Sequence, residues 1–182
     1  MLELRALGLS DMEMIRGWRA GAMETLRTPM MLTREQQEAW YRDVICDRRS
    51  LTRYWGLWAP SGQYSMFVGY GGIENIEWEN RRGEISLLIG PDYRGRGYGR
   101  EAVRLFLDRA FNYLNLDWVW GECYMCGHPE FWRRCAEEYG GLTQVLRARK
   151  FYAGDYRDSL YFTFERGAAC ESVREEANGG RV

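Results

Sequence analysis

The stretch Arg94-Gly95-Arg96-Gly97-Tyr98-Gly99-Arg100 decides how this chain is interpreted. It lies between an apolar stretch expected to form a strand over residues 84–89 and a stretch with helical periodicity over residues 100–114. Three closely spaced glycines let the backbone turn successive N–H groups inward, and the helix adds its N-terminal N–H groups and positive dipole end. Arg94, Arg96 and Arg100 add formal charge. The combination predicts a cradle for an anion, favouring a diphosphate, and the alternative is a glycine-rich turn that only links strand to helix.

Three other motifs for phosphate or nucleic acid fit this stretch less well. A dinucleotide fingerprint G-x-G-x-x-G, counted from Gly95, has Arg100 where the third glycine belongs. The Gly-Lys-Ser/Thr of a P-loop is missing. An Arg-Gly-rich RNA-binding tract would be disordered, whereas two ordered elements frame this one. The net charge of −1 also argues against a protein that coats nucleic acid.

Hydrophobic periodicity and turn signals predict a mixed sheet with helices on its faces. The patterns Ser10 to Glu13 and Thr33 to Gln36 predict capping boxes at helix starts, and Ala153-Gly154-Asp155 predicts a hairpin turn. We expect strands at residues 2–7, 54–59, 65–76 (with a bulge near 69–72), 84–89, 117–124, 142–152 and 156–164, and helices at 11–20, 34–48, 100–114 and 129–139. This order predicts one α/β (α+β) domain with about six to seven strands and about four helices.

Composition is typical of a single globular domain. The 182 residues, 46% of them hydrophobic, can fill one core, expected within residues 1–166, whereas the polar stretch 167–182 is expected to be a flexible tail. No apolar run approaches the roughly 18 to 20 residues that span a bilayer, and the first residues lack a signal-peptide pattern, so we expect a cytoplasmic protein without a membrane partner. The odd number of cysteines predicts reduced thiols. Lys150 is the only lysine, so the cationic side chains are arginine forks suited to carboxylate and phosphate.

The central motif resembles that of a known enzyme family. Arg94-x-x-Gly97-x-Gly99, after a strand and before a helix, is similar to the R/Q-x-x-G-x-G/A coenzyme A motif of the GNAT acetyltransferases. The run from Gly83 to Gly99 resembles the branch of ribosomal-protein N-terminal, spermidine and nucleotide-amino-sugar acetyltransferases. Residues 151–158 and 33–41 support this likeness, which spans about residues 2–165. It implies a single-domain GNAT-like fold.

The resemblance also implies acetyl-CoA as co-substrate. Backbone N–H groups of Gly95 to Gly99 would hold its pyrophosphate, and Leu88 and Ile89 would pair with its pantetheine arm where their strand splays from the strand at 117–124. The expected cofactor-binding set is Leu88, Ile89, Arg94, Gly95, Arg96, Gly97, Tyr98, Gly99 and Arg100.

Glu84 is the candidate general base. A cationic amine must lose a proton before it attacks a thioester, and a carboxylate can take that proton directly or through water. Members of the resembling branch often carry a glutamate at the matching place. The alternative is a surface ion pair with Arg81 or Arg82. The acidic residues just upstream either gather a cationic acceptor or form a solvated hairpin rim: Glu74, Glu77 and Glu79.

The sequence departs from the family where the general acid is expected. The usual tyrosine of the helix at 129–139 falls near Cys135 or Ala136, and the asparagine often seen before this helix is missing, with His128 nearby. Tyr139 is the candidate acid, and the alternative is a tyrosine packed at an interface. Departure of the thiolate also works without an acid.

Two further patterns receive structural interpretations. Cys123-x-x-Cys126-x-His128 suggests zinc, but Cys123 lies inside an expected strand and no second Cys-x-x-Cys follows, so we expect no metal. Trp118 and Trp120 share one face of their strand and are expected in the core.

The sequence therefore predicts an N-acetyltransferase that moves an acetyl group to a primary amine by direct attack. The expected acceptor is a small amine, an amino sugar or a protein N-terminus, and a polyamine fits less well. A homodimer is compatible with the sequence. The alternatives are a CoA-binding regulatory module without turnover and a nucleic-acid binder that uses the Arg-Gly loop.

Overall fold

The computed structural model describes residues 1–167 and residue 169. Its strands are β1 (Glu3–Arg5), β2 (Arg53–Ser61), β3 (Tyr64–Glu77), β4 (Arg82–Ile89), β5 (Trp118–Tyr124), β6 (Thr143–Tyr152) and β7 (Asp155–Glu165). Its helices are α1 (Met12–Ala20), α2 (Arg34–Trp40), α3 (Tyr98–Asp108) and α4 (Pro129–Glu138). Short π-helical turns, Tyr41–Ile45 and Arg109–Tyr113, continue α2 and α3. The expected element order is confirmed, whereas the expected tail at 167–182 falls almost wholly outside the described residues.

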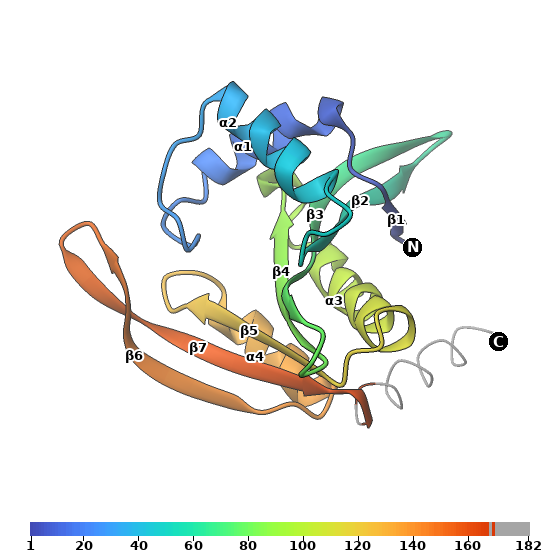
Figure 1. Ribbon diagram of the computed structural model, residues 1–182. Coiled ribbons are helices and arrows are strands. Elements are labelled where there is room, and N and C mark those ends of the chain that lie inside the picture. The colour runs from blue at the N-terminus through green and yellow to red at the C-terminus, as the bar shows by residue number, and fades with distance from the viewer. Residues whose placement is uncertain (168, 170–182) are drawn as a thin grey trace.

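The described strands form a seven-stranded sheet in the order β1-β2-β3-β4-β5-β7-β6. Neighbouring strands are antiparallel except β4 and β5, which run parallel. Within the described residues, the pairing of β4 with β5 extends from Arg82 opposite Trp118 to Glu84 opposite Trp120. Beyond that point the two strands separate, and the sheet opens into a V (Figure 1).

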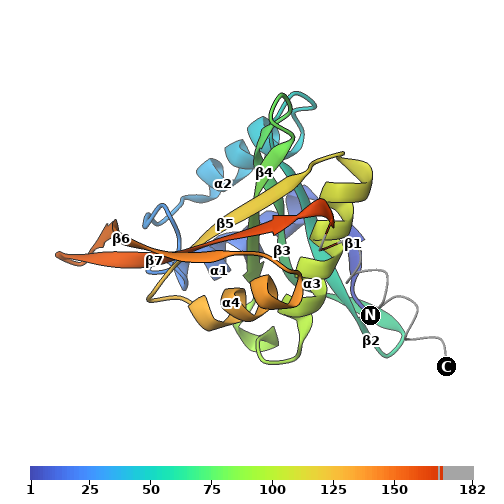
Figure 2. The ribbon, with the colours of Figure 1, turned by 90° about the horizontal axis from the view of Figure 1, so that it is seen from below.

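Two hydrophobic clusters cover opposite faces of the sheet. α3 and α4 lie on one face (Figure 2). There they bury Val103, Phe106 and Ala136 against Ile85 and Phe162, among others. On the other face, the apolar side of α1 and α2 packs against the side chains of Tyr70 and Leu88 on β3 and β4. The helices therefore leave the second face over β5, β7 and β6 open, and the exposed position of Trp118, 44% accessible, agrees with this.

One of the two expected capping boxes forms. The Thr33 hydroxyl accepts from the Gln36 N–H at 3.2 Å, and the Gln36 side chain accepts from the Thr33 N–H at 2.9 Å. The box expected at Ser10 is wrong: a 3-10 turn over Leu9–Asp11 precedes α1, and the Asp11 carboxylate accepts from the Gly8 N–H at 2.8 Å. The aspartate therefore satisfies a donor of the preceding turn.

The tight hairpin between β6 and β7 is confirmed. Ala153 and Gly154 have φ of 51° and 87°, as a two-residue turn of this hand requires. A bulge is expected near residues 69–72, and the observed irregularity lies just before that range. The register between β2 and β3 shifts between the pairs Leu57–Gly69 and Trp58–Phe67.

Candidate active site

The glycine loop between β4 and α3 has the geometry of an open cradle. Gly95 and Gly97 have φ of +74° and +82°, a left-handed region that favours glycine. A Cβ added at either position would meet no described atom within 4 Å. Glu101 donates its N–H to the Gly97 carbonyl at 3.2 Å, so the amides of Tyr98 and Gly99 lie ahead of this helical hydrogen bond. These donors and the open space fit a diphosphate.

The three arginines of the loop point to different partners. Arg94 donates through Nε to the Ile89 carbonyl at 3.2 Å, and Arg96 donates to the Asp92 carbonyl at 3.0 Å. Both side chains stay on the loop. Arg100 instead pairs with Glu138 at the end of α4, with Nε and Oε1 2.8 Å apart. Its guanidinium therefore links two helices, and only its place at the start of α3 supports the expected cofactor contact.

The free edge of β4 is suited to an extended ligand. The Gly90 N–H donates to the Val68 carbonyl on β3 at 2.9 Å. Since backbone groups of successive strand residues point to opposite edges, Leu88 also faces β3, while Leu87 and Ile89 face the V. The expectation that Leu88 pairs with a pantetheine arm is therefore wrong, because β3 occupies that edge, whereas the backbone of Ile89 faces the V and its contact with the arm stays a prediction. The Leu88 side chain packs under α1 instead.

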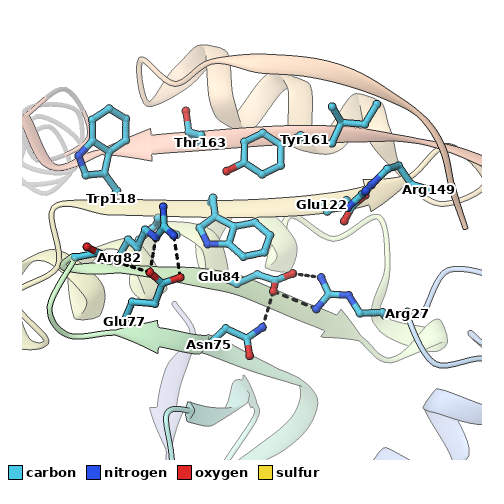
Figure 3. Close-up of a pocket in the computed structure, with 14 residues that line it drawn as sticks. Arg27, Asn75, Glu77, Arg82, Glu84, Trp118, Glu122, Arg149, Tyr161 and Thr163 are labelled. Atoms are coloured by element: carbon cyan, nitrogen blue, oxygen red, sulfur yellow. Dashed lines mark hydrogen bonds and ion pairs between the residues drawn. The ribbon is translucent and has the colours of Figure 1, made fainter.

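A groove of about 740 Å³ lies on the open face beside the closed end of the V (Figure 3). Its floor is formed by side chains of β4, β5 and β7, including Trp118, Trp120 and Tyr161. Trp120 and Tyr161 are stacked with centroids 5.7 Å apart and ring planes 22° apart. Trp118 and Trp120 therefore line a groove, which corrects their expected place in the core. Alternation showed that they share a face, but not which face the helices cover.

Glu84 lies in this groove at the point where β4 and β5 part. Its Oε2 accepts from Arg27 Nη1 at 3.1 Å and from Asn75 Nδ2 at 2.8 Å, and Arg27 Nη2 pairs with Oε1 (Figure 3). The residue is 3% exposed. The hydrogen bond to Glu84 raises the pKa of Arg27 above its ordinary value. The alternative for Glu84, a surface ion pair with Arg81 or Arg82, is wrong, since these arginines bind Asp117 and Glu77.

The other acidic residues of the β3–β4 region separate into two environments. Glu77 lies in an ion pair with Arg82 that lowers the pKa of Glu77, and Glu79 is exposed. These two form the rim of the hairpin. Glu74 is directly opposite Glu84 across the two strands and accepts a hydrogen bond from the Tyr54 hydroxyl. Burial raises the pKa of Glu74, and the charge of Glu84 adds to this, whereas the Tyr54 hydrogen bond opposes it.

The segment that carries Arg27 is held in place by Lys150, a residue that the sequence analysis did not assign to the site. The Lys150 ammonium donates to the backbone carbonyls of Met23, Glu24 and Leu26, and lies 5.0 Å from the ring centroids of Tyr124 and Tyr152. Burial lowers the pKa of Lys150. Its status as the only lysine was the one signal in the sequence.

A register shift in β6 turns Lys150 inward. The pairing of β6 with β7 is interrupted between Leu146 and Lys150, where Ala148 has φ of 52° and donates its N–H to Asp158 at 2.9 Å. Such a bulge re-aims the side chains that follow it. The strand therefore exposes Arg149 to the groove. It buries Lys150 under the α1–α2 segment, the residues 21–33 that connect these two helices.

The structure favours the packing interpretation of Tyr139. The residue caps the end of α4, is 0% exposed and lies in the core with its ring 6.3 Å from that of Phe164. An acid must reach the leaving sulfur, and a side chain enclosed in the core has no such access. Cys135 and Ala136, the two positions near which the family's tyrosine is expected, are also buried, and burial raises the pKa of Cys135 to about 12.

The cysteines near β5 are packed within the fold. Burial raises the pKa of Cys123 to about 11, and Cys126 Sγ contacts the Glu24 carbonyl at 3.3 Å. Among residues 1–167 and 169, no group of three His, Cys, Asp or Glu side chains is arranged to hold a metal ion. In the same residues, no helix combines the length and apolar character needed to cross a membrane.

Comparison with known proteins gives a family and a set of similar folds. Residues 1–133 match the model of the acetyltransferase (GNAT) domain. The spermidine N-acetyltransferase from Vibrio cholerae in complex with CoA and spermine is similar with a TM-score of 0.79 and 22% identity, over 93% of this chain and 98% of that one. Its dodecameric form in an intermediate state gives a TM-score of 0.74 and 22% identity, over 91% and 94%. At this identity the likeness shows the fold.

The search of curated proteins gives no match. The family match rests on most of the chain, and it covers the open V, the glycine cradle and the strand that carries Glu84. The chain therefore belongs to the GNAT acetyltransferase family, whose members transfer an acetyl group from acetyl-CoA to an amine.

Proposed function

We propose that the groove beside the V binds a primary amine and that Glu84 is the base that prepares it for acetyl transfer. The observation that carries this proposal is the position of Glu84: it is buried in the groove at the vertex where β4 and β5 separate. The glycine cradle lies at the other end of the same strand. From Glu84 to Ile89 is five strand steps, roughly 17 Å at about 3.3 Å per residue, which matches an extended pantetheine arm.

The bound co-substrate supplies the acetyl thioester, and the protein supplies position and proton removal. Amides of the glycine loop and of the first turn of α3 would hold the diphosphate, with Arg94 and Arg96 beside it. The Leu87 and Ile89 backbone groups face the V, where an N–H would polarise the thioester oxygen. No cysteine lies in the groove to form a covalent intermediate within the described residues, so direct attack by the amine is the mechanism that fits.

Glu84 would take the proton of the acceptor amine through a lone pair that its present partners leave open. Each carboxylate oxygen has two acceptor sites, and among the described residues Oε1 accepts only from Arg27. Arg27 and Asn75 keep the carboxylate oriented toward the groove. Glu74 is paired with Glu84 across β3 and β4, and burial raises the pKa of this second carboxyl group.

The test is release of free CoA thiol from acetyl-CoA in the presence of a panel of amines. Acetyl transfer gives thiol release that depends on an amine and one acetylated product per thiol. A non-catalytic CoA-binding module would show a CoA-induced rise in melting temperature with no amine-dependent release. A nucleic-acid binder would show a salt-dependent shift of DNA or RNA that survives saturating CoA. Either result would contradict the proposal.

A further inference from the structure

The charges that line the groove are paired, but the two signs are not equally exposed. Three arginine–glutamate pairs lie there in the described residues: Arg27 with Glu84, Arg149 with Glu122, and Arg82 with Glu77. In the first two pairs the arginine side chains are 52% and 51% exposed, whereas the glutamate side chains are 4% and 8% exposed. A ligand that enters between Arg27 and Arg149 therefore meets guanidinium groups before carboxylates, whereas Glu77 of the third pair is 40% exposed.

Arg27 and Arg149 serve the same end of the groove. Figure 3 shows Arg27 reaching Glu84 from the α1–α2 segment and Arg149 reaching Glu122 from β6. Their charges are close enough to interact, since Arg27 helps to lower the pKa of Glu122 and opposes the charged form of Arg149. The Ser159 hydroxyl donates to Glu122 at 2.6 Å and completes the buried support beneath Arg149. Two half-exposed planar forks thus face one space, the geometry that suits a carboxylate or phosphate.

Resting on the function proposed above, we infer that the acceptor carries an anionic group, a carboxylate or a phosphate, in the same molecule as the amine, and that Arg27 and Arg149 bind it. The ion pairs of the groove support this inference, because the charges there must stay balanced when the ligand binds. An ammonium at the open lone pair of Glu84 shares with Arg27 a carboxylate that burial keeps from water. If the acceptor also brings an anion to the exposed side of Arg27, the added positive charge is balanced and no charge is left unpaired.

A polyamine would fit this groove poorly. Its second ammonium would enter a space where two guanidinium groups are exposed and the carboxylates are already engaged. Like charges repel, and at this end of the groove no exposed carboxylate of the described lining residues offsets the repulsion, because Glu77 lies beside Arg82, away from Arg27 and Arg149 (Figure 3). The side chains of this groove therefore select against the spermine-like ligand of the similar Vibrio cholerae structure.

The test uses acceptor pairs that share one amine and differ in one charge. Glucosamine is compared with glucosamine 6-phosphate, and alanyl-glutamine amide with alanyl-glutamate amide, so the two pairs distinguish a phosphate from a carboxylate. In at least one pair, kcat/KM should be about tenfold to a hundredfold higher for the anionic member, the contribution of a charge-assisted hydrogen bond. Spermidine should be poorer than both anionic members. Equal use of both members of each pair, or preference for spermidine, would overturn the inference and leave the proposed function standing.

Absence of turnover with every amine would overturn the proposed function and the inference together. This outcome differs from turnover without a preference for the anionic acceptor, which would overturn the inference alone. Arg149→Gln should reduce the ratio of anionic to neutral kcat/KM toward 1, and Arg149→Lys should restore part of it. The ratio is unaffected by a partial loss of folded protein, which lowers both rates equally. Arg134→Gln, an exposed position on α4 on the opposite face of the sheet, is the matched control and should keep the ratio. A ratio unchanged by Arg149→Gln would contradict the assignment.

Discussion

Glu84→Gln and Arg27→Gln break the same ion pair in different ways. The first removes the carboxylate and nearly keeps its shape, whereas the second leaves the carboxylate in place. If Glu84 takes the proton of the acceptor, Glu84→Gln should lower kcat roughly 10²- to 10⁴-fold, the usual contribution of a positioned acid or base. Arg27→Gln keeps the base and should lower kcat much less.

The free energies of unfolding should rank the two variants in the opposite order. Glu84→Gln leaves a guanidinium that is 52% exposed and remains hydrated, so the loss should be about 1 kcal/mol or less. Arg27→Gln leaves a carboxylate that is 4% exposed without its cation, and the loss should approach about 3 kcal/mol, the low end for a buried charge, because Asn75 still donates to it.

The assay measures kcat by thiol release at saturating substrates across pH, and stability by urea unfolding. The rate deficit of Glu84→Gln should shrink at high pH, where the free amine needs no base. The CoA-induced rise in melting temperature should stay, since the cradle lies at the far end of β4. The reasoning is refuted if kcat follows the same ranking as stability, or if Glu84→Gln stays within a few-fold of the wild type at every pH.

Three further predictions concern the cradle, the pH dependence of stability and the α1–α2 segment. Gly97→Val should abolish the CoA-induced rise in melting temperature. The control Gly62→Val should keep it, because Gly62 has a similar positive φ and equally open surroundings but is remote from the cradle. Both variants should lose about 1–2 kcal/mol of stability, because valine is strained in a left-handed backbone conformation. Because burial raises the pKa of Glu74, its contribution to folding is present below its ordinary pKa of 4.5 and lost as pH rises through the folded value, so urea unfolding should show Glu74→Gln gaining on the wild type from pH 4 to 7. The pKa of Glu77 is lowered, so Glu77→Gln should lose relative to the wild type over the same rise. Lys150→Met should cost at least about 2 kcal/mol in urea unfolding and raise KM for the amine with KM for acetyl-CoA unchanged; an unchanged amine KM would show that this lysine has no part in positioning Arg27.

Local patterns predicted the elements of the fold well, because each depends on neighbours in sequence. Apolar spacing placed α3 within two residues of its observed start at Tyr98, and the expected helical end at 114 includes the π-helical turn that follows α3. The capping box at Thr33 formed because its partners are three residues apart. The box at Ser10 did not form, because a competing turn engaged the neighbouring Asp11.

The parts of the site that the sequence did not reveal depend on residues far apart in the chain. Glu84 was predicted from its strand, but its partner Arg27 lies 57 positions away in a segment without periodicity. Lys150 reaches carbonyls more than 120 positions away. No spacing rule connects such residues, since only the assembled sheet brings β6 beside the α1–α2 segment.

The arginine-rich surface has a consequence for an enzyme that works with an activated acyl group. A deprotonated lysine amine is a nucleophile, so an exposed lysine can be acylated by a thioester. Here the one lysine is 5% exposed and its ammonium is held by three carbonyls, while guanidinium groups stay protonated at physiological pH and are poor nucleophiles. The only lysine is therefore shielded from acylation, and lysine-directed labels, crosslinkers and regulatory acylation lack an exposed side-chain target.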